Sequence, residues 1–389
     1  MAPGSGKRWT GIRPLPSMAT PRPPFRADHV GSLLRPPALK ALRQKKESGQ
    51  ASAEELALAE DAAIRDAVTL QQGIGLQGIT DGEMRRKSWH MDFLLQLGGL
   101  ESAGKTLPVA FHGGAGDLFF TRPDLQISGR VTRPKPIFVE AFKFLRSVVG
   151  YTPKLTIPSP SMLYTQVGRA NIDANVYPDL DTFAEDTAAA YRAEIADLYA
   201  AGCRYLQFDD VSLAYLCDDE LRAQSRARGD DPDVQLALSV KLIQATLRDR
   251  PQDLTVCTHL CRGNFRSGWR AQGGYAKVAD TILNQMPYDG FFLEFDDARS
   301  GDFSPLRYAP KNIRVVLGLI TTKVGALEKK DDLERRLDTA SKYISLDQVC
   351  LSPQCGFSST IEGNDVTVDQ QKAKLSLCVE LADAVWGSL

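Results

Sequence analysis

Short runs of apolar and β-branched residues alternate with longer helix-like segments along most of the chain. The short runs predict buried strands, whereas the longer segments, rich in Ala, Glu and Leu, predict helices. Strands are expected over residues 25–31, 76–81, 154–159, 205–209, 254–259, 291–295, 313–319 and 348–351. Helices are expected over residues 53–73, 182–201, 233–248, 331–344 and 370–386.

Eight strands with intervening helices predict an α/β fold of the (β/α)₈ TIM-barrel type rather than an open doubly wound sheet. No Gly-rich phosphate motif follows the first strand, which weakens the dinucleotide-binding alternative. Residues 97–150 are too many for a simple connection and contain a possible hairpin near 125–131. We expect them to form a lid-like insertion beside the active site.

The domain organisation predicted is one catalytic barrel over residues 25–389, preceded by a tail. Residues 1–24 contain four basic residues, six prolines and no acidic residue. This composition predicts a disordered tail. A targeting segment is the alternative, although the prolines oppose the amphipathic helix that a transit peptide needs.

The overall composition is that of a soluble globular protein. The formal net charge is -1, so no general basic field attracts nucleic acid or an anionic membrane, and no apolar run has the length of a membrane span. Seven widely spaced cysteines, an odd number, indicate a reducing compartment, and we expect a cytoplasmic protein. The sequence does not indicate the oligomeric state.

Candidate metal ligands occur at the ends of three predicted strands. His259 and Cys261 are two residues apart and can point to the same face of a strand, and both residue types bind zinc. Glu294 ends an apolar strand, where a salt bridge with Arg299 or Arg314 is the alternative explanation.

Cys355 follows the last strand, where a thiol that caps a turn is the alternative. The carboxyl ends of barrel strands carry the active site in essentially all barrel enzymes, so these positions favour a catalytic metal site.

Further polar residues follow other strands. Glu83 lies beyond strand two, the pair Asp209 and Asp210 ends strand four, and Gly31 and Ser32 end strand one. Such acids are usually solvated loop residues. At the catalytic end of a barrel they could hold an ammonium group, and the backbone N–H groups after strand one could hold a carboxylate. Together these groups would suit an amino acid.

The chain contains six short motifs in a characteristic order: Val30-Gly31-Ser32, Gly82-Glu83, Gln207-Phe208-Asp209, His259-Leu260-Cys261, Glu294 followed by Arg299-Ser300, and Pro353-Gln354-Cys355-Gly356. With these motifs the chain resembles the C-terminal catalytic barrel of cobalamin-independent methionine synthases and its single-barrel relatives. The resemblance covers roughly residues 25–388.

The resemblance implies roles for eight residues. It implies that one Zn²⁺ is bound by His259, Cys261, Glu294 and Cys355, that Glu83 and Asp209 hold the amino group of homocysteine, and that Gly31 and Ser32 hold its carboxylate. Zinc deprotonates a bound thiol at neutral pH. The implied activity is methyl transfer from a methyltetrahydrofolate-type or other donor to homocysteine or a similar small thiol, giving methionine from homocysteine.

The chain departs from the family on the methyl-donor side. Tyr164 is the best match to the family's Trp after strand three, and residues 319–323, after strand seven, contain no His. The second, N-terminal barrel of methionine synthase has no counterpart in this sequence. Basic residues of the insertion could replace one of its functions, the binding of an acidic folate tail: Lys105, Arg122, Arg130, Arg133 and Lys135.

These departures leave the proton donor open among Tyr164, Asp210 and Lys323. Because of these departures, two alternatives to homocysteine methylation remain open. One is alkyl transfer to or from a different small thiol, as in the epoxyalkane–coenzyme M transferases. The other is a catalytically inactive zinc-binding relative, against which the intact Glu83 and Asp209 argue. A metal-free decarboxylase on a related barrel is a weaker alternative.

Overall fold

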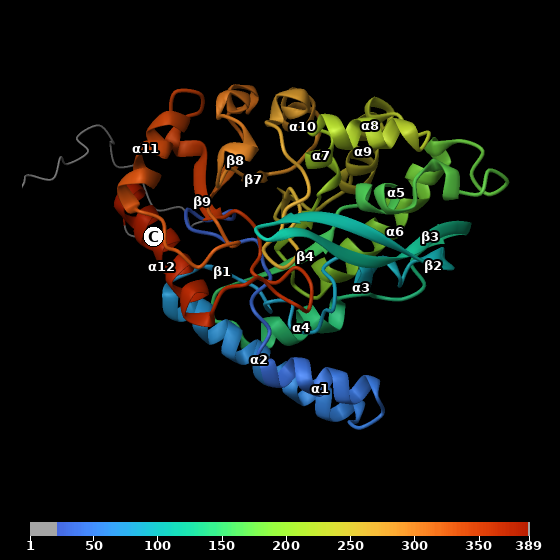
Figure 1. The fold of residues 1–389 in the computed structure, drawn as a ribbon, viewed down its shortest axis with the longest axis horizontal. Helices are drawn as coiled ribbons and strands as arrows, with labels where there is room; N and C mark the ends of the chain where they lie inside the picture. Colours follow the sequence, from blue (N-terminus) through green and yellow to red (C-terminus); the bar gives the residue numbers. More distant parts are fainter. Residues whose placement is uncertain (1–21, 388–389) are drawn as a thin grey trace, which may run out of the picture.

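Seven parallel strands form one curved sheet in the computed structural model, which describes residues 22–387 (Figure 1). In sheet order they are β1 (Gly78–Ile79), β4 (Thr152–Pro158), β5 (Tyr205–Asp209), β6 (Thr255–Leu260), β7 (Gly290–Glu294), β8 (Arg314–Ile320) and β9 (Val349–Pro353). Every neighbouring pair is parallel. All seven strands lie within two residues of ranges predicted from the sequence, except that β1 is only two residues long.

The segment predicted as the first strand takes the eighth position without forming a regular strand. Ala27 makes an isolated parallel bridge to Leu351 of β9, and the His29 ring contacts a β1 backbone carbonyl at 3.1 Å. The Asp28 carboxylate accepts the backbone N–H of His29 at 2.8 Å, which diverts this donor from a strand ladder. The predicted α/β barrel is therefore confirmed, with an irregular segment between β9 and β1.

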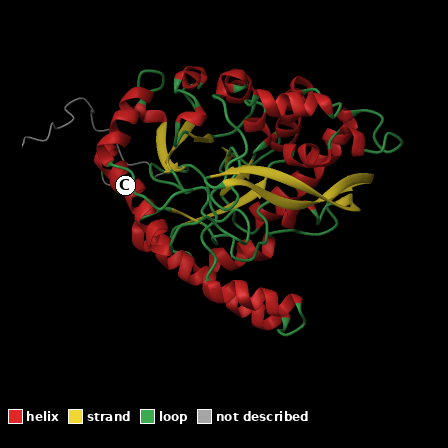
Figure 2. Ribbon diagram, viewed as in Figure 1, coloured by secondary structure: helices red, strands yellow, loops and turns green. Residues whose placement is uncertain are grey.

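Helices surround the sheet (Figure 2). They are α1 (Pro37–Glu47), α2 (Ala53–Ile74), α3 (Met91–Leu94), α4 (Val139–Val148), α5 (Ser161–Val167), α6 (Leu180–Ala200), α7 (Ser212–Tyr215), α8 (Asp219–Ala227), α9 (Pro232–Leu247), α10 (Ala279–Gln285), α11 (Lys330–Ala340) and α12 (Val368–Trp386). Short 3₁₀ helices are Arg169–Asn171, Tyr275–Lys277, Ala298–Ser300, Ser304–Tyr308 and Leu346–Gln348.

Within residues 22–387, no helix has both the length and the apolarity that a membrane crossing requires. The tail predicted over residues 1–24 falls largely on residues 1–21, which lie outside the described part.

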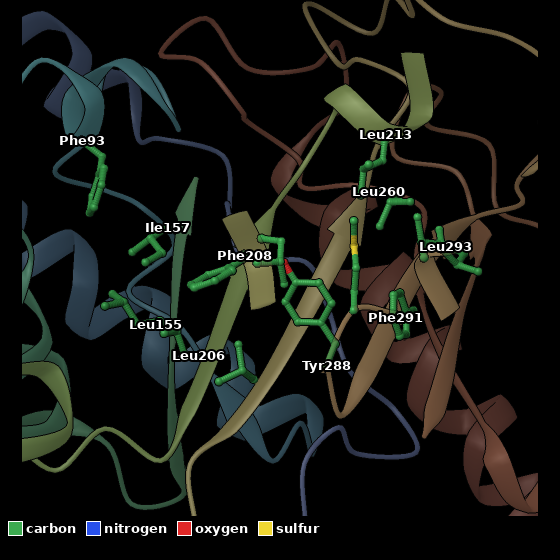
Figure 3. Close-up of a cluster of buried hydrophobic side chains, with 14 of the residues drawn as sticks. Phe93, Leu155, Ile157, Leu206, Phe208, Leu213, Leu260, Tyr288, Phe291 and Leu293 are labelled. Carbon is green, nitrogen blue, oxygen red and sulfur yellow. The ribbon is translucent and has the colours of Figure 1, made fainter. Parts of the chain in front are cut away.

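Strand residues alternate between the helical layer and the barrel interior. Leu206 and Phe208 of β5 belong to the large cluster between sheet and helices (Figure 3). Tyr205 belongs to a second cluster, together with Cys257 of β6 and residues of β7, β8 and β9, inside the barrel. Because side chains alternate along a strand, Asp209 shares the face of Tyr205, and His259 shares the face of Cys257. The polar residues therefore lie at the carboxyl end of the barrel interior.

A long antiparallel hairpin forms the first part of the predicted insertion, separate from the parallel strands (Figure 2). It consists of β2 (Gly98–Gly113) and β3 (Gly116–Thr132), and is much longer than the hairpin predicted near 125–131. His112 at the tip exchanges backbone hydrogen bonds of 2.6 and 3.0 Å with Trp269, which follows β6. At the other end, Ile127 bridges to Ile172. The hairpin is thus fixed at both ends.

Candidate metal and substrate site

Three of the four predicted metal ligands converge at the carboxyl end of the sheet. The ligand atoms of His259, Cys261 and Cys355 all lie within 4.8 Å of one another. His259 is in β6, Cys261 directly follows it, and Cys355 lies two residues beyond β9. All three are at most 5% exposed. Two sulfurs and one imidazole nitrogen form a donor set that suits zinc.

The two thiols of this group are hydrogen-bonded to each other. Their Sγ atoms lie 3.2 Å apart, and all seven cysteines are free. The hydrogen bond from Cys261 holds the pKa of the Cys355 thiol well below its usual value and raises that of Cys261. The environment of Cys355 thus favours its thiolate form, and a thiolate is the form that binds a metal.

The His259 ring supports the assignment of a metal site. It is 2% exposed, yet neither ring nitrogen has a hydrogen-bond partner in the described part of the chain. Buried polar groups without partners are rare in native proteins and call for a specific explanation. A metal ion bound to one ring nitrogen would give that nitrogen a partner, and the two cysteine sulfurs beside it would be further ligands. The residues therefore fit Zn²⁺.

Glu294, the fourth predicted ligand, lies near this group but outside the three residues that converge. Its Oε2 accepts the Arg262 N–H at 2.9 Å, and its Oε1 lies 3.3 Å from Arg299 Nη2 and 3.9 Å from Lys323 Nζ. The salt bridge with Arg299 expected as an alternative is therefore present, whereas Arg314 contacts backbone carbonyls instead. Zinc ligation by Glu294 stays a prediction.

The predicted amino-group ligands are buried carboxylates in the same pocket. Glu83 Oε1 accepts a hydrogen bond from Thr156 at 2.9 Å, and its Oε2 has no hydrogen-bond partner among the described residues. Asp209 Oδ1 accepts from Gln207 at 2.6 Å. Burial raises the pKa of Asp209 to about 7 and also raises that of Glu83, with the charge of Glu83 adding to the effect on Asp209. Two buried arginines offset part of the Glu83 charge, Arg86 at 3.6 Å and Arg35 at 3.9 Å. Two buried carboxylates in one pocket still suit a bound cation.

Gly31 and Ser32 lie beside these carboxylates. Gly31 has φ +142°, and a Cβ there would lie 2.7 Å from the Thr156 methyl group. The position therefore requires glycine. Ser32 lines the pocket, and its hydroxyl accepts the Ser358 N–H at 3.3 Å. Glu83 also has a positive φ of 58°, uncommon for a residue other than glycine and often associated with functional sites.

The candidate proton donors are less well placed. The Tyr164 hydroxyl donates to Asp230 at 2.9 Å and lines a neighbouring pocket rather than the one that contains the metal ligands. Asp210 lines the main pocket but accepts the Ser212 N–H at 2.9 Å as well as side-chain hydroxyls. Lys323 is buried beside Glu294 and is not a wall of the pocket.

The pocket encloses about 1030 Å³ of empty space, part of it open to solvent. Sequence reasoning missed much of its wall, which includes Trp89, His90, Phe111, Arg122, Arg228 and Arg270. These residues come from the loop before α3, the hairpin, and the segments after α8 and β6. Only Arg122 had a signal in the sequence, as one of the basic residues of the insertion.

The fold and the site together define an α/β barrel with a His/Cys/Cys group that could hold a metal at the carboxyl ends of its strands. The family model described as cobalamin-independent synthase, catalytic domain, matches residues 25–383. The chain belongs to the family of cobalamin-independent methionine synthase catalytic domains, and the resemblance noted in the sequence is confirmed.

The relatives differ in what they indicate. YxjH of Bacillus subtilis (strain 168), an uncharacterized protein, is 46% identical over 93% of this chain and 95% of its own length. A Listeria monocytogenes structure, assigned provisionally as a vitamin-B12-independent methionine synthase, is 36% identical, with a TM-score of 0.75 and coverage of 94% and 99%. The 5-methyltetrahydropteroyltriglutamate–homocysteine methyltransferase of Thermosynechococcus vestitus is 23% identical, and the alignment spans only 42% of that protein.

Proposed function

We propose that this protein is a zinc-dependent S-methyltransferase that activates homocysteine, or a similar small thiol, for methyl transfer. The observation that carries the proposal is the position of His259, Cys261 and Cys355 in one pocket with the buried carboxylates of Glu83 and Asp209. The first group suits a thiol-activating metal, and the second suits an ammonium group. A thiol that also carries an amino group satisfies both.

The residues would act as follows. His259, Cys261, Cys355 and Glu294 would hold the ion, which when bound lowers the pKa of a coordinated thiol so that its sulfur is a thiolate at neutral pH. Glu83 and Asp209 would orient the amino group. The sulfur then attacks the methyl carbon of the donor, and the bond from this carbon to the donor breaks. The leaving group keeps the electron pair and accepts a proton if it needs one.

Alkyl transfer to or from a different small thiol is the second candidate. The specific observation in its favour is the donor side of the pocket, where Tyr164 lies outside and Asp210 is already hydrogen-bonded. The thiol-activating residues are the same in both candidates. The two candidates differ in the thiol that is bound and in the molecule that exchanges the alkyl group with it.

A direct assay tests the proposal. Zinc-loaded protein incubated with homocysteine and a panel of methyl donors, comprising folate, S-methyl and sulfonium compounds, should form methionine with at least one of them. Product formation measured by mass spectrometry, with mercaptoethanesulfonate as an alternative thiol, identifies the acceptor. Alkylation of that thiol alone would favour the second candidate. Absence of any alkylated thiol would overturn both and favour an inactive relative.

We expect Asp209→Asn to weaken homocysteine binding by roughly ten- to a hundredfold without removal of zinc. A charge-assisted hydrogen bond contributes about 1.5–3 kcal/mol, and this substitution removes the charge. Calorimetric titration with homocysteine, alongside metal analysis, measures both quantities. Asp331→Asn, at an exposed position that does not line the pocket, is the matched control. Unchanged affinity would mean that the thiol lacks an amino group or binds elsewhere.

A further inference from the structure

Three arginines form one wall of the pocket that contains the metal ligands. Arg122 lies on β3 of the hairpin, Arg228 follows α8, and Arg270 lies beyond β6. We call these residues the arginine cluster. They are far apart in the sequence, so only the fold brings their charges together.

No carboxylate of the described residues forms a close ion pair with the arginine cluster. Within residues 22–387, none of its three side chains has a carboxylate oxygen within 4.0 Å. Other arginines of the same region are paired: Arg130, also on β3, donates to Asp186 at 2.7 Å. The three charges also act on one another. Burial lowers the pKa of the Arg122 guanidinium, the charge of Asp124 opposes this effect, and the charges of Arg228 and Arg270 add to it.

Protein groups hold two of these side chains in place. The Arg270 guanidinium donates to the Ala110 carbonyl of β2 at 3.1 Å and lies 5.4 Å from the centre of the Tyr215 ring, while its Nε is buried without a partner. Arg122 donates to the adjacent Pro123 carbonyl at 3.0 Å. Each of these bonds uses one of the five N–H groups that a guanidinium carries, so most donors remain available.

We propose that the arginine cluster binds a multiply charged oxyanion, of the carboxylate or phosphate type, that belongs to the second substrate. Unpaired guanidinium groups in a pocket are the arrangement that recognises such anions. The other charged wall of the same pocket, Glu83 and Asp209, favours a cation. The residues proposed to hold the thiol and those proposed to hold the anion are therefore different parts of the wall of one pocket.

The identification of the anion as part of the second substrate rests on the proposed function, but the binding of an anion does not. The test therefore measures binding without turnover. Zinc-loaded protein is titrated calorimetrically at low ionic strength with two probes: a triglutamate peptide for the carboxylate source and inorganic triphosphate for the phosphate source. We expect at least one of them to bind, and the one that binds identifies the type of anion.

Arg122→Gln, Arg228→Gln and Arg270→Gln should each weaken binding of that probe by roughly ten- to a hundredfold, because each removes a charge-assisted hydrogen bond. Arg130→Gln, on the same strand but outside the pocket, should bind the probe as the wild type does. Zinc content should be unchanged in all four variants.

The inference is overturned if neither probe binds with a Kd below roughly 1 mM, a weak-binding limit of about -4.1 kcal/mol. It is also overturned if the three variants bind like the wild type, or if Arg130→Gln weakens binding equally. Homocysteine titration of the wild type separates this result from the proposed function. If the anion binds and homocysteine does not, only the homocysteine proposal is refuted. If homocysteine binds and neither anion does, only the assignment of the arginine cluster as an anion site is refuted.

Discussion

Cys355→Ser is expected to release most of the bound zinc and to reduce methyl transfer by roughly 10²–10³-fold or more. Zinc sites with four protein ligands bind with about 10–16 kcal/mol, so an even share per ligand is about 2.5–4 kcal/mol. Loss of that share corresponds to roughly 10²–10³-fold in affinity. Cys261→Ser should behave similarly, because the two thiols lie 3.2 Å apart in the same group.

The fold should survive both substitutions, because the hydrophobic core lies mainly between the sheet and the helices rather than around the metal ligands. Metal analysis of the purified variants and their thermal unfolding together separate loss of the ion from loss of structure. Cys350→Ser is a matched control: this cysteine lies in β9, is fully buried and is not part of the converging group. One equivalent of zinc retained in both Cys261→Ser and Cys355→Ser would refute the ligand assignment.

The sequence predicted these cysteines because the period of a strand is short and regular. If the strand predicted over residues 254–259 continues for two residues, His259 and Cys261 share a face. The structure ends β6 at Leu260, and the ligand atoms of the two residues nevertheless lie within 4.8 Å of each other. The positions of β4 to β9 in the sequence were likewise predicted from local patterns of apolar residues. Local pattern is sufficient here because the strands are buried on both sides and their apolar runs are clear.

Local pattern fails where a side chain competes with the backbone. Residues 25–31 read as a strand, but Asp28 accepts the N–H of His29 and receives Lys154 Nζ at 2.9 Å, so the segment makes only one bridge to β9. Neither Lys154 nor its distance from Asp28 could be inferred from a sequence pattern, since the two residues are far apart in the chain.

The donor side of the pocket was equally inaccessible to sequence reasoning. The hairpin was predicted as a short element near 125–131, and its true length places Phe111 and Arg122 in the pocket wall. Arg228 and Arg270 belong to other segments and carry no motif. Tyr164 is the best sequence match to the family's Trp, yet its hydroxyl donates to Asp230 and lines a neighbouring pocket. Contacts between loops that are far apart in the sequence produce no periodic pattern from which they could be predicted.

The donor side leads to the last expected result: a folate donor should be used poorly. With triglutamyl methyltetrahydrofolate, we expect kcat/KM to be roughly 10²–10⁴-fold below that with a sulfonium donor. The folate nitrogen leaves readily only when protonated, and a positioned general acid contributes a factor of this size. A sulfonium donor already carries a positive charge and leaves as a neutral sulfide, so it needs no acid.

Three residues at or near the pocket are poorly suited to act as the acid. Burial, together with the charge of Arg122, lowers the pKa of His90 to about 3, so its ring is neutral at pH 7. Burial and the bond to Asp230 raise the pKa of Tyr164, which also lies outside the pocket. Asp209 has a pKa raised to about 7, but an ammonium group held there would lower it again.

The arginine cluster sharpens this prediction, because it would hold an acidic folate tail without assisting the chemistry. A guanidinium is always protonated in proteins and therefore cannot act as the proton donor. A folate compound should consequently bind through its tail and inhibit the reaction with the sulfonium donor, although it transfers its methyl group slowly. Steady-state kinetics with homocysteine and both donors measure the two effects. A folate kcat/KM of roughly 10⁴ M⁻¹s⁻¹ or more, the lower end of ordinary enzyme efficiency, would contradict the prediction and show that the pocket supplies an acid after all.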